Sequence, residues 1–227
     1  MKKSDLLFGL VLVAIFLPFF VSEPLYEAYK SFNAQHGMLM SFFKFGILAT
    51  LGEMLGARIG RKQYLPQAFG MLPKMIVWGI LGMFINGAMI VFSNGIPVVL
   101  KTLGIHDAIT AFQGSLSWTK VLVALSISVA MNTFFAPVFM TFHKITDMHI
   151  HNYGGSLKAL MHPIPMGQLI AELDWKKQWG FVFKKTIPLF WYPAHTITFL
   201  LPGELRVLFA ALLGVVLGVL LAIAAKR

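Results

Sequence analysis

Residues 41–62, SFFKFGILATLGEMLGARIGRK, form the stretch that decides the fold. This stretch is mostly apolar, ends in basic residues and carries one acidic residue, Glu53, near its middle. A helix needs about 20 mostly apolar residues to cross the roughly 30 Å of hydrocarbon in a bilayer. The small and polar residues of the stretch recur at helical spacing on one face: Gly46, Thr50, Glu53, Ala57 and Gly60. The sequence therefore predicts a transmembrane helix with one polar stripe.

The composition of the whole chain also indicates a membrane protein. Of its 227 residues, 57% are hydrophobic and 12% are charged, and the mean hydropathy is +0.74. A soluble domain is about half apolar and about a quarter charged, so the excess of apolar residues predicts a lipid environment. The chain has no cysteine, which excludes disulfide bonds and thiolate chemistry.

Six apolar stretches predict an all-α fold, a polytopic bundle of about six transmembrane helices that forms a single domain over residues 1–227. The stretches are residues 6–21, 38–57, 75–92, 121–140, 187–201 and 207–225. The first and the fifth are shorter than the usual length of a span, and prolines make them the least regular. Four or five spans are the alternatives, for example if the first helix lies at the interface and the last two form one re-entrant unit.

The basic residues predict the topology. In a six-span chain with both termini in the cytoplasm, the basic residues of the outer segments are Lys30, Lys101 and Arg206. Those of the inner segments are Lys2, Lys3, Arg58, Arg61, Lys62, Lys74, Lys144, Lys158, Lys176, Lys177, Lys184, Lys185, Lys226 and Arg227. Cytoplasmic segments carry an excess of Lys and Arg, so this bias supports the topology. It also accounts for the net charge of +10 without nucleic acid as a partner.

The longest predicted cytoplasmic loop covers residues 143–180. Part of it, PMGQLIAELDWKKQWGFVF at residues 165–183, combines apolar and basic residues as an amphipathic helix at a membrane surface does. Basic residues near an anionic membrane surface contribute about 1 kcal/mol each to binding. We therefore predict anionic lipid as a partner of the lysines in and just after this loop. These lysines are Lys158, Lys176, Lys177, Lys184 and Lys185.

Polar residues inside the predicted spans mark a candidate seam through the bundle. An ionisable group in a span costs about 2.5–3.5 kcal/mol and usually faces a bundle interior or a cavity. Glu53 has two interpretations: it pairs with a cation or hydroxyl of a neighbouring helix, or it lines a pore. Pro193 interrupts the fifth span, so His195 or Thr196 faces the cavity that the kink opens. The predicted seam-lining residues are Glu53, Thr50, Asn86, Ser128, Asn132, His195 and Thr196.

The sequence lacks the motifs of common enzymes and metal sites. It has no G-x-S-x-G elbow, no Gly-rich phosphate loop and no pair of carboxylates within one predicted span. The loop contains His143, His149, His151 and His162, but no carboxylate stands at the H-E-x-x-H spacing of a zinc site. We predict no catalytic residues, no metal site and no cofactor.

Ordered motifs over residues 38–225 resemble those of a known family. The motif residues are Gly46, Gly52, Pro137, Trp191, Pro193, Pro202 and Arg206. They follow the order found in the Mpv/peroxisomal-membrane-protein family, small multispan proteins of the mitochondrial inner membrane and the peroxisome. Glu53 stands where that family has Asp, and Asn132-Thr133 stands where it has Asp-Gln. The resemblance implies a pore for small solutes or metabolites.

The polar seam and the resemblance together predict a channel or permeation pathway for small solutes, and not an enzyme. Two alternatives stay open. The first is a non-conducting scaffold that acts through the basic loop, and the second is a proton-coupled transporter that titrates Glu53 or His195. A homo-oligomer also stays open as a partner. The N-terminus lacks an Arg-rich, Ser-rich transit peptide, which predicts a bacterial inner membrane, with an organelle membrane as the alternative.

Overall fold

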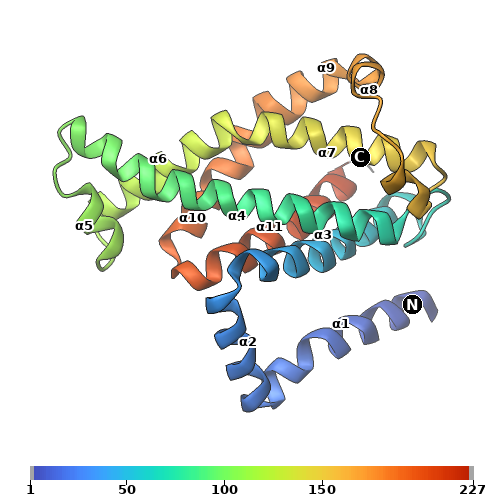
Figure 1. The fold of residues 1–227 in the computed structure, drawn as a ribbon, viewed down its shortest axis with the longest axis horizontal. Coiled ribbons are helices and arrows are strands. Elements are labelled where there is room, and N and C mark those ends of the chain that lie inside the picture. The colour runs from blue at the N-terminus through green and yellow to red at the C-terminus, as the bar shows by residue number, and fades with distance from the viewer. Residues whose placement is uncertain (1–2, 225–227) are drawn as a thin grey trace. The chain divides into compact units, whose positions relative to one another are not determined.

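The computed structural model describes residues 3–224, with the backbone alone at residues 221, 222 and 224. Every regular element within these residues is a helix, which confirms the predicted all-α class. Figure 1 shows the course of the chain. Four residues used in the sequence analysis lie outside the described part: Lys2, Lys226, Arg227 and the last residue of the predicted final span, residue 225.

The chain divides into two compact units, Met1–Met40 and Ser41–Arg227. The first unit contains α1 (Lys3–Val21) and α2 (Glu23–Gln35). The side chain of Ser22 accepts a hydrogen bond from the Leu25 amide at 3.4 Å, which satisfies one of the free amides at the start of α2. All described side chains of α1 are at least partly exposed, as expected of an apolar helix that meets lipid.

The second unit is a bundle of long helices joined by shorter ones. Its long helices are α3 (Gly37–Arg61, which begins in the first unit), α4 (Met71–Thr102), α6 (Trp118–Phe134), α7 (Ala136–Asn152) and α11 (Gly203–Ala224). Helix α4 packs along both α6 and α7. Figure 1 shows α5 (Ala108–Gln113) at one end of this bundle and α8 (Met166–Glu172) at the other.

Glycines bring the long helices close together. A Cβ atom at Gly46 of α3 would lie 2.8 Å from the backbone oxygen of Met75 in α4. A Cβ atom at Gly52 would lie 2.9 Å from Cα of Val215 in α11. Small residues at such positions let membrane helices approach until their backbones almost touch. Two of the motif residues, Gly46 and Gly52, therefore fix the spacing of α3 against α4 and α11.

The predicted span at residues 121–140 is bent. Helices α6 and α7 meet at an angle of 46°, and Pro137 lies in the first turn of α7, where its missing N–H costs no helical hydrogen bond. Helix α7 continues to Asn152, well beyond the predicted end of the span. Its last turns are helical because one face is buried, with Ile145 and Ile150 almost completely covered.

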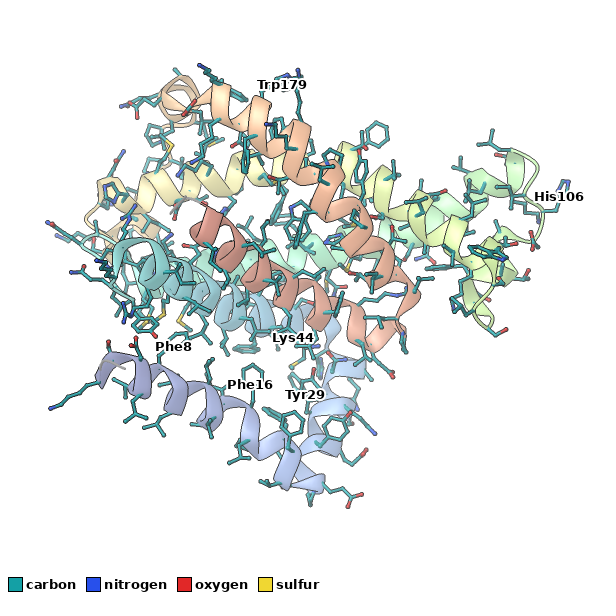
Figure 2. All side chains as sticks on the ribbon, turned by 180° about the vertical axis from the view of Figure 1, so that it is seen from behind. Phe8, Phe16, Tyr29, Lys44, His106 and Trp179 are labelled. Atoms are coloured by element: carbon teal, nitrogen blue, oxygen red, sulfur yellow. The ribbon has the colours of Figure 1, made fainter. Side chains whose placement is uncertain are left out.

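The loop that follows α7 contains several short elements instead of one long surface helix. These are η1 (Leu157–Met161), α8 (Met166–Glu172), α9 (Trp175–Lys177) and the start of η2 (Gln178–Trp191). Leu169 and Leu173 are buried against Ile145 of α7, so the apolar face of the predicted amphipathic helix packs on protein. Trp179 remains exposed and points outward from η2 (Figure 2).

The predicted fifth span, residues 187–201, is divided between two elements. The π-helix η2 ends at Trp191, and α10 (Tyr192–Leu200) follows directly, with Pro193 in its first turn. The Tyr192 carbonyl at this junction accepts hydrogen bonds from Ser128 Oγ at 2.8 Å and from Thr196 Oγ1 at 2.7 Å. These two hydroxyl groups tie α6 and the first turn of α10 to the junction.

Four helices of the described chain are long and apolar enough to cross a membrane: α1, α3, α4 and residues Gly203–Leu220 of α11. The bent pair α6–α7 makes a fifth candidate. This is the arrangement of a helical, multi-pass membrane protein. The count of six spans and the cytoplasmic position of both termini stay predictions.

Candidate functional site

Glu53 lies at the centre of a polar cluster that joins α3, α4 and α7. Its Oε2 atom accepts a hydrogen bond from Lys74 Nζ at 2.5 Å. Its Oε1 atom accepts a hydrogen bond from Trp78 Nε1 at 2.7 Å and lies 3.3 Å from Nε2 of His143. Lys74 and Trp78 are four residues apart on α4 and so share one face of that helix. The interpretation that Glu53 pairs with a cation of a neighbouring helix is therefore confirmed.

A second carboxylate completes the cluster. Asp147 forms a hydrogen-bonded ion pair with Lys74, and its other oxygen lies 4.0 Å from Lys144 Nζ. Asp147 and His143 are four residues apart on α7 and present the same face. The Lys74 side chain is only 9% exposed, and it bridges carboxylates from two different helices. Hereafter the ion-pair cluster means Glu53, Lys74, Trp78, His143 and Asp147.

A cavity of about 430 Å³ lies on one side of the ion-pair cluster. Its wall is mostly apolar, with side chains such as Phe45, Ile85 and Phe135 from α3, α4 and the α6–α7 junction. Besides residues of the ion-pair cluster, α6, η2 and α10 contribute polar side chains to the wall: Asn132, Gln178, Thr186, Trp191 and His195. We call this hollow the inner cavity.

A second cavity, of about 610 Å³, lies where α3, the start of α4 and the end of α7 meet. Its wall is more polar and includes Arg61, Gln67, His151 and Asn152. We call it the outer cavity. Four residues line both cavities: Glu53, Gly56, Lys144 and Asp147. The two carboxylates of the ion-pair cluster therefore stand between the two hollows.

The predicted seam residues are only partly brought together. Glu53, Asn132 and His195 all line the inner cavity. Thr50 is buried but does not belong to the wall of either cavity. Asn86 donates a hydrogen bond to Ser41 Oγ at 2.8 Å and so joins α4 to α3.

The other two seam residues support the backbone. Ser128 and Thr196 both donate to the Tyr192 carbonyl, and neither lines the inner cavity. Asn132 donates to the Ser128 carbonyl at 2.8 Å in addition to its place in the wall.

The remaining motif residues shape the C-terminal part of the bundle. Trp191 ends η2 beside the inner cavity. Pro202 is exposed and directly precedes α11. Arg206 donates from Nε to the Leu201 carbonyl at 3.0 Å, and its guanidinium lies 4.8 Å from the ring centre of Phe112. This arginine closes the turn between α10 and α11 and contacts α5.

Most of the ion-pair cluster is not evident from the sequence. Lys74 precedes the apolar run of α4 and is predicted to lie in an inner loop, and His143 and Asp147 fall within residues 143–180, the loop predicted after the fourth span. In the structure all three belong to helices. The spacing of Lys74 from Trp78, and of His143 from Asp147, is the signal that indicates two polar helix faces aimed at Glu53.

Within residues 3–224, no group of three or more His, Asp or Glu side chains is arranged to hold a metal ion. No protein-family model, no curated protein and no solved structure matches the chain.

Proposed function

We propose that the protein is a permeation pathway for small solutes, and that the ion-pair cluster controls it. The observation that carries this proposal is that Glu53 and Asp147 line both the inner and the outer cavity. A solute that moves from one cavity to the other passes these carboxylates. Polar and charged side chains that line a constriction select permeants in known channels.

The proposed control is the bridging position of Lys74. While Lys74 contacts both carboxylates, α3, α4 and α7 are held together and the passage between the cavities is closed. Movement of the Lys74 ammonium away from one carboxylate opens it.

The resemblance to the Mpv/peroxisomal-membrane-protein family supports the same proposal, because that family is associated with small-solute pores. The proposal places the protein in a bacterial inner membrane, with an organelle membrane as the alternative. If the protein forms a homo-oligomer, each copy carries its own pathway.

Flux into proteoliposomes tests the proposal. Vesicles with the purified protein are mixed with glycerol or erythritol, and re-swelling is followed by light scattering. We expect faster re-swelling than in empty vesicles, and a further increase for Glu53→Gln, because the neutral amide holds Lys74 less strongly. The matched control is Glu204→Gln, an exposed acid at the start of α11. Re-swelling equal to that of empty vesicles, unchanged by Glu53→Gln, contradicts the proposal.

A proton-coupled transporter is the second candidate, and one contact favours it. His143 Nε2 lies 3.3 Å from Glu53 Oε1, so a proton can be exchanged between a histidine in the wall of the inner cavity and the carboxylate that lines both cavities. Solute accumulation that follows an imposed pH gradient supports this candidate. Uptake that ignores the gradient supports a passive pathway.

A scaffold that binds anionic lipid is the third candidate. The lysines predicted for this role, Lys158, Lys176, Lys177, Lys184 and Lys185, are all exposed. If the protein is a scaffold, replacing these lysines by glutamates abolishes its activity in cells, whereas Glu53→Gln leaves that activity unchanged. The opposite pattern supports the permeation pathway.

A further inference from the structure

Buried polar atoms without a hydrogen-bond partner surround the inner cavity. Within residues 3–224 four side-chain atoms are of this kind: Thr50 Oγ1, Gln178 Nε2, Trp191 Nε1 and His195 Nδ1. All but Thr50 belong to residues that line the cavity. Gln178 is 8% exposed and His195 is 5% exposed. A buried donor or acceptor that stays unpaired costs about 1–3 kcal/mol. Because unpaired buried groups are rare, three of them around one cavity indicate a site for a molecule that pairs with them.

Two of the atoms form one polar spot. Trp191 is the last residue of η2, and His195 lies one turn further along α10. Their rings meet edge to face with centres 5.0 Å apart. An indole N–H can only donate, and an imidazole with its proton on Nδ1 donates as well. The two neighbouring rings therefore supply two hydrogen-bond donors among the residues of the cavity wall.

The surroundings of this spot are neutral. Trp191 lies next to the Ser128 hydroxyl of α6, which is 3.4 Å from the Trp191 carbonyl. His195 also contacts the ring of Phe199. The charged residues in the wall of the inner cavity are Glu53, Lys144, Asp147 and Lys177, from α3, α7 and α9. A neutral acceptor such as a carbonyl oxygen fits the Trp191–His195 spot better than an anion, since the lysines that the described residues place in the wall, Lys144 and Lys177, belong to other elements.

The third atom lies at the other end of η2. Gln178 is the first residue of this helix and Trp191 is the last, and both line the inner cavity. The cavity therefore extends along η2, where Phe181, Val182 and Thr186 line it between these two residues. Its volume of about 430 Å³ lies in the range of about 300–1,000 Å³ found for small-molecule sites.

We propose that the inner cavity binds a neutral, elongated, mostly apolar molecule whose carbonyl oxygen accepts hydrogen bonds from Trp191 Nε1 and His195 Nδ1. Gln178 Nε2 donates to a second acceptor at the other end of the molecule. The proposal deepens the proposed function, because it names a class of solute, and it rests on that function only for the step in which the solute crosses the membrane. Binding itself does not require conduction.

Equilibrium binding tests the proposal on the full chain in lipid nanodiscs. The probe is methyl decanoate, which has a neutral carbonyl and an apolar chain. Undecane, which has no acceptor, and decanoate, which carries a charge, are the comparison compounds. Bound mass is measured by native mass spectrometry. We expect methyl decanoate to bind about tenfold more tightly than undecane, as two additional hydrogen bonds predict, and more tightly than decanoate.

Single substitutions locate the probe. Trp191→Phe keeps an aromatic ring but removes the N–H, and we expect it to weaken methyl decanoate binding about fivefold while undecane binding is unchanged. Gln178→Leu leaves methyl decanoate binding unchanged, because this probe has no acceptor at the end of its chain for Gln178 Nε2. The matched control is Trp179→Phe, on the same helix but exposed and outside the cavity wall (Figure 2). This control leaves binding unchanged.

Several results overturn the proposal. Equal binding of methyl decanoate and undecane means that water alone satisfies the three polar atoms. Tighter binding of decanoate means that the site is built for an anion. If Trp191→Phe does not fold, the comparison of the three probes on the wild-type protein still decides. Binding without flux supports this proposal and contradicts the permeation pathway, whereas glycerol flux without methyl decanoate binding does the reverse.

Discussion

Lys74 is the residue on which the ion-pair cluster depends. It is buried between Glu53 and Asp147, and its removal takes away the buried cation that the two carboxylates share. Breaking a buried ion pair by removing one partner costs about 3–5 kcal/mol. We therefore expect Lys74→Met to lower the thermal stability of the purified protein strongly, as measured by its unfolding in detergent.

Lys144→Met is the control for this substitution. Its side chain is 54% exposed and its Nζ lies 4.0 Å from Asp147, and pairs of this kind contribute about 0–1 kcal/mol. A large loss of stability in Lys144→Met, or none in Lys74→Met, contradicts the central position of Lys74. Adding Glu53→Gln to Lys74→Met should recover part of the loss, since it removes one of the unpaired carboxylates.

At the residue scale, the sequence predicted the important acid but not its partners. Glu53 is conspicuous because it interrupts an apolar run. Lys74 and Asp147 lie at the ends of apolar runs, where a charge is ordinarily solvated. Their burial results from the way three helices pack, and hydropathy along one segment carries no information about that packing. Of the three residues with unpaired polar atoms at the inner cavity, only His195 was predicted from the sequence to face a cavity.

At the element scale, close helix packing makes a prediction about Gly46. A methyl group there would lie 2.8 Å from the Met75 backbone oxygen, and a backbone atom cannot move aside as a flexible side chain can. We expect Gly46→Ala to force α3 away from α4 and to cost about 1–3 kcal/mol. The loss is measured by thermal unfolding in detergent.

Gly60 offers the comparison on the same helix. No atom lies within 4 Å of a Cβ placed there, and Ala is favoured over Gly inside a helix by about 0.5–1 kcal/mol. Gly60→Ala should therefore leave stability unchanged or raise it slightly. Equal effects of the two substitutions would contradict the close contact of α3 with α4.

Helix α8 carries a second prediction at this scale. Leu169 is completely buried, whereas its neighbour Ile170 is 39% exposed. Truncation of a buried Leu to Ala costs about 2–5 kcal/mol. We expect Leu169→Ala to lower thermal stability much more than Ile170→Ala does. If the two variants are equally stable and only Ile170→Ala binds vesicles more weakly, α8 contacts the lipid surface instead of packing on α7.

Long elements were predicted better than short ones. The apolar runs of α3, α4 and α11 exceed what any soluble helix requires, so their existence follows from composition. The end of α7 and the division of the loop into α8, α9 and η2 depend on contacts such as Leu169 with Ile145. Pro137 marks the position of the bend between α6 and α7 in the sequence, but the sequence does not indicate the angle of the bend.

At the scale of the whole molecule, the topology predicts that the two ends of the bent pair α6–α7 lie on opposite sides of the membrane. The loop at His106 joins α4 to α5 (Figure 2), and Asn152 ends α7. Both residues are exposed. The chain crosses the membrane between them if the bent pair α6–α7 is one span, and the excess of basic residues predicts that Asn152 lies inside.

Single-cysteine variants test this topology without background, because the natural chain has no cysteine. We expect His106→Cys to react with a membrane-impermeant maleimide in intact cells, and Asn152→Cys to react only after the membrane is permeabilised. Labelling of both in intact cells would show that α6–α7 does not span the membrane.

The ion-pair cluster also has a consequence for biosynthesis. Glu53 and Lys74 are 21 residues apart, whereas Lys74 and Asp147 are 73 residues apart. During translation the hairpin of α3 and α4 is complete long before α7 emerges from the ribosome. One negative and one positive side chain can then enter the bilayer as a neutral pair, which lowers the cost of inserting each. When α7 is inserted, Asp147 pairs with a lysine that is already in the membrane. The order of synthesis therefore provides each charged side chain with an oppositely charged partner when it is inserted.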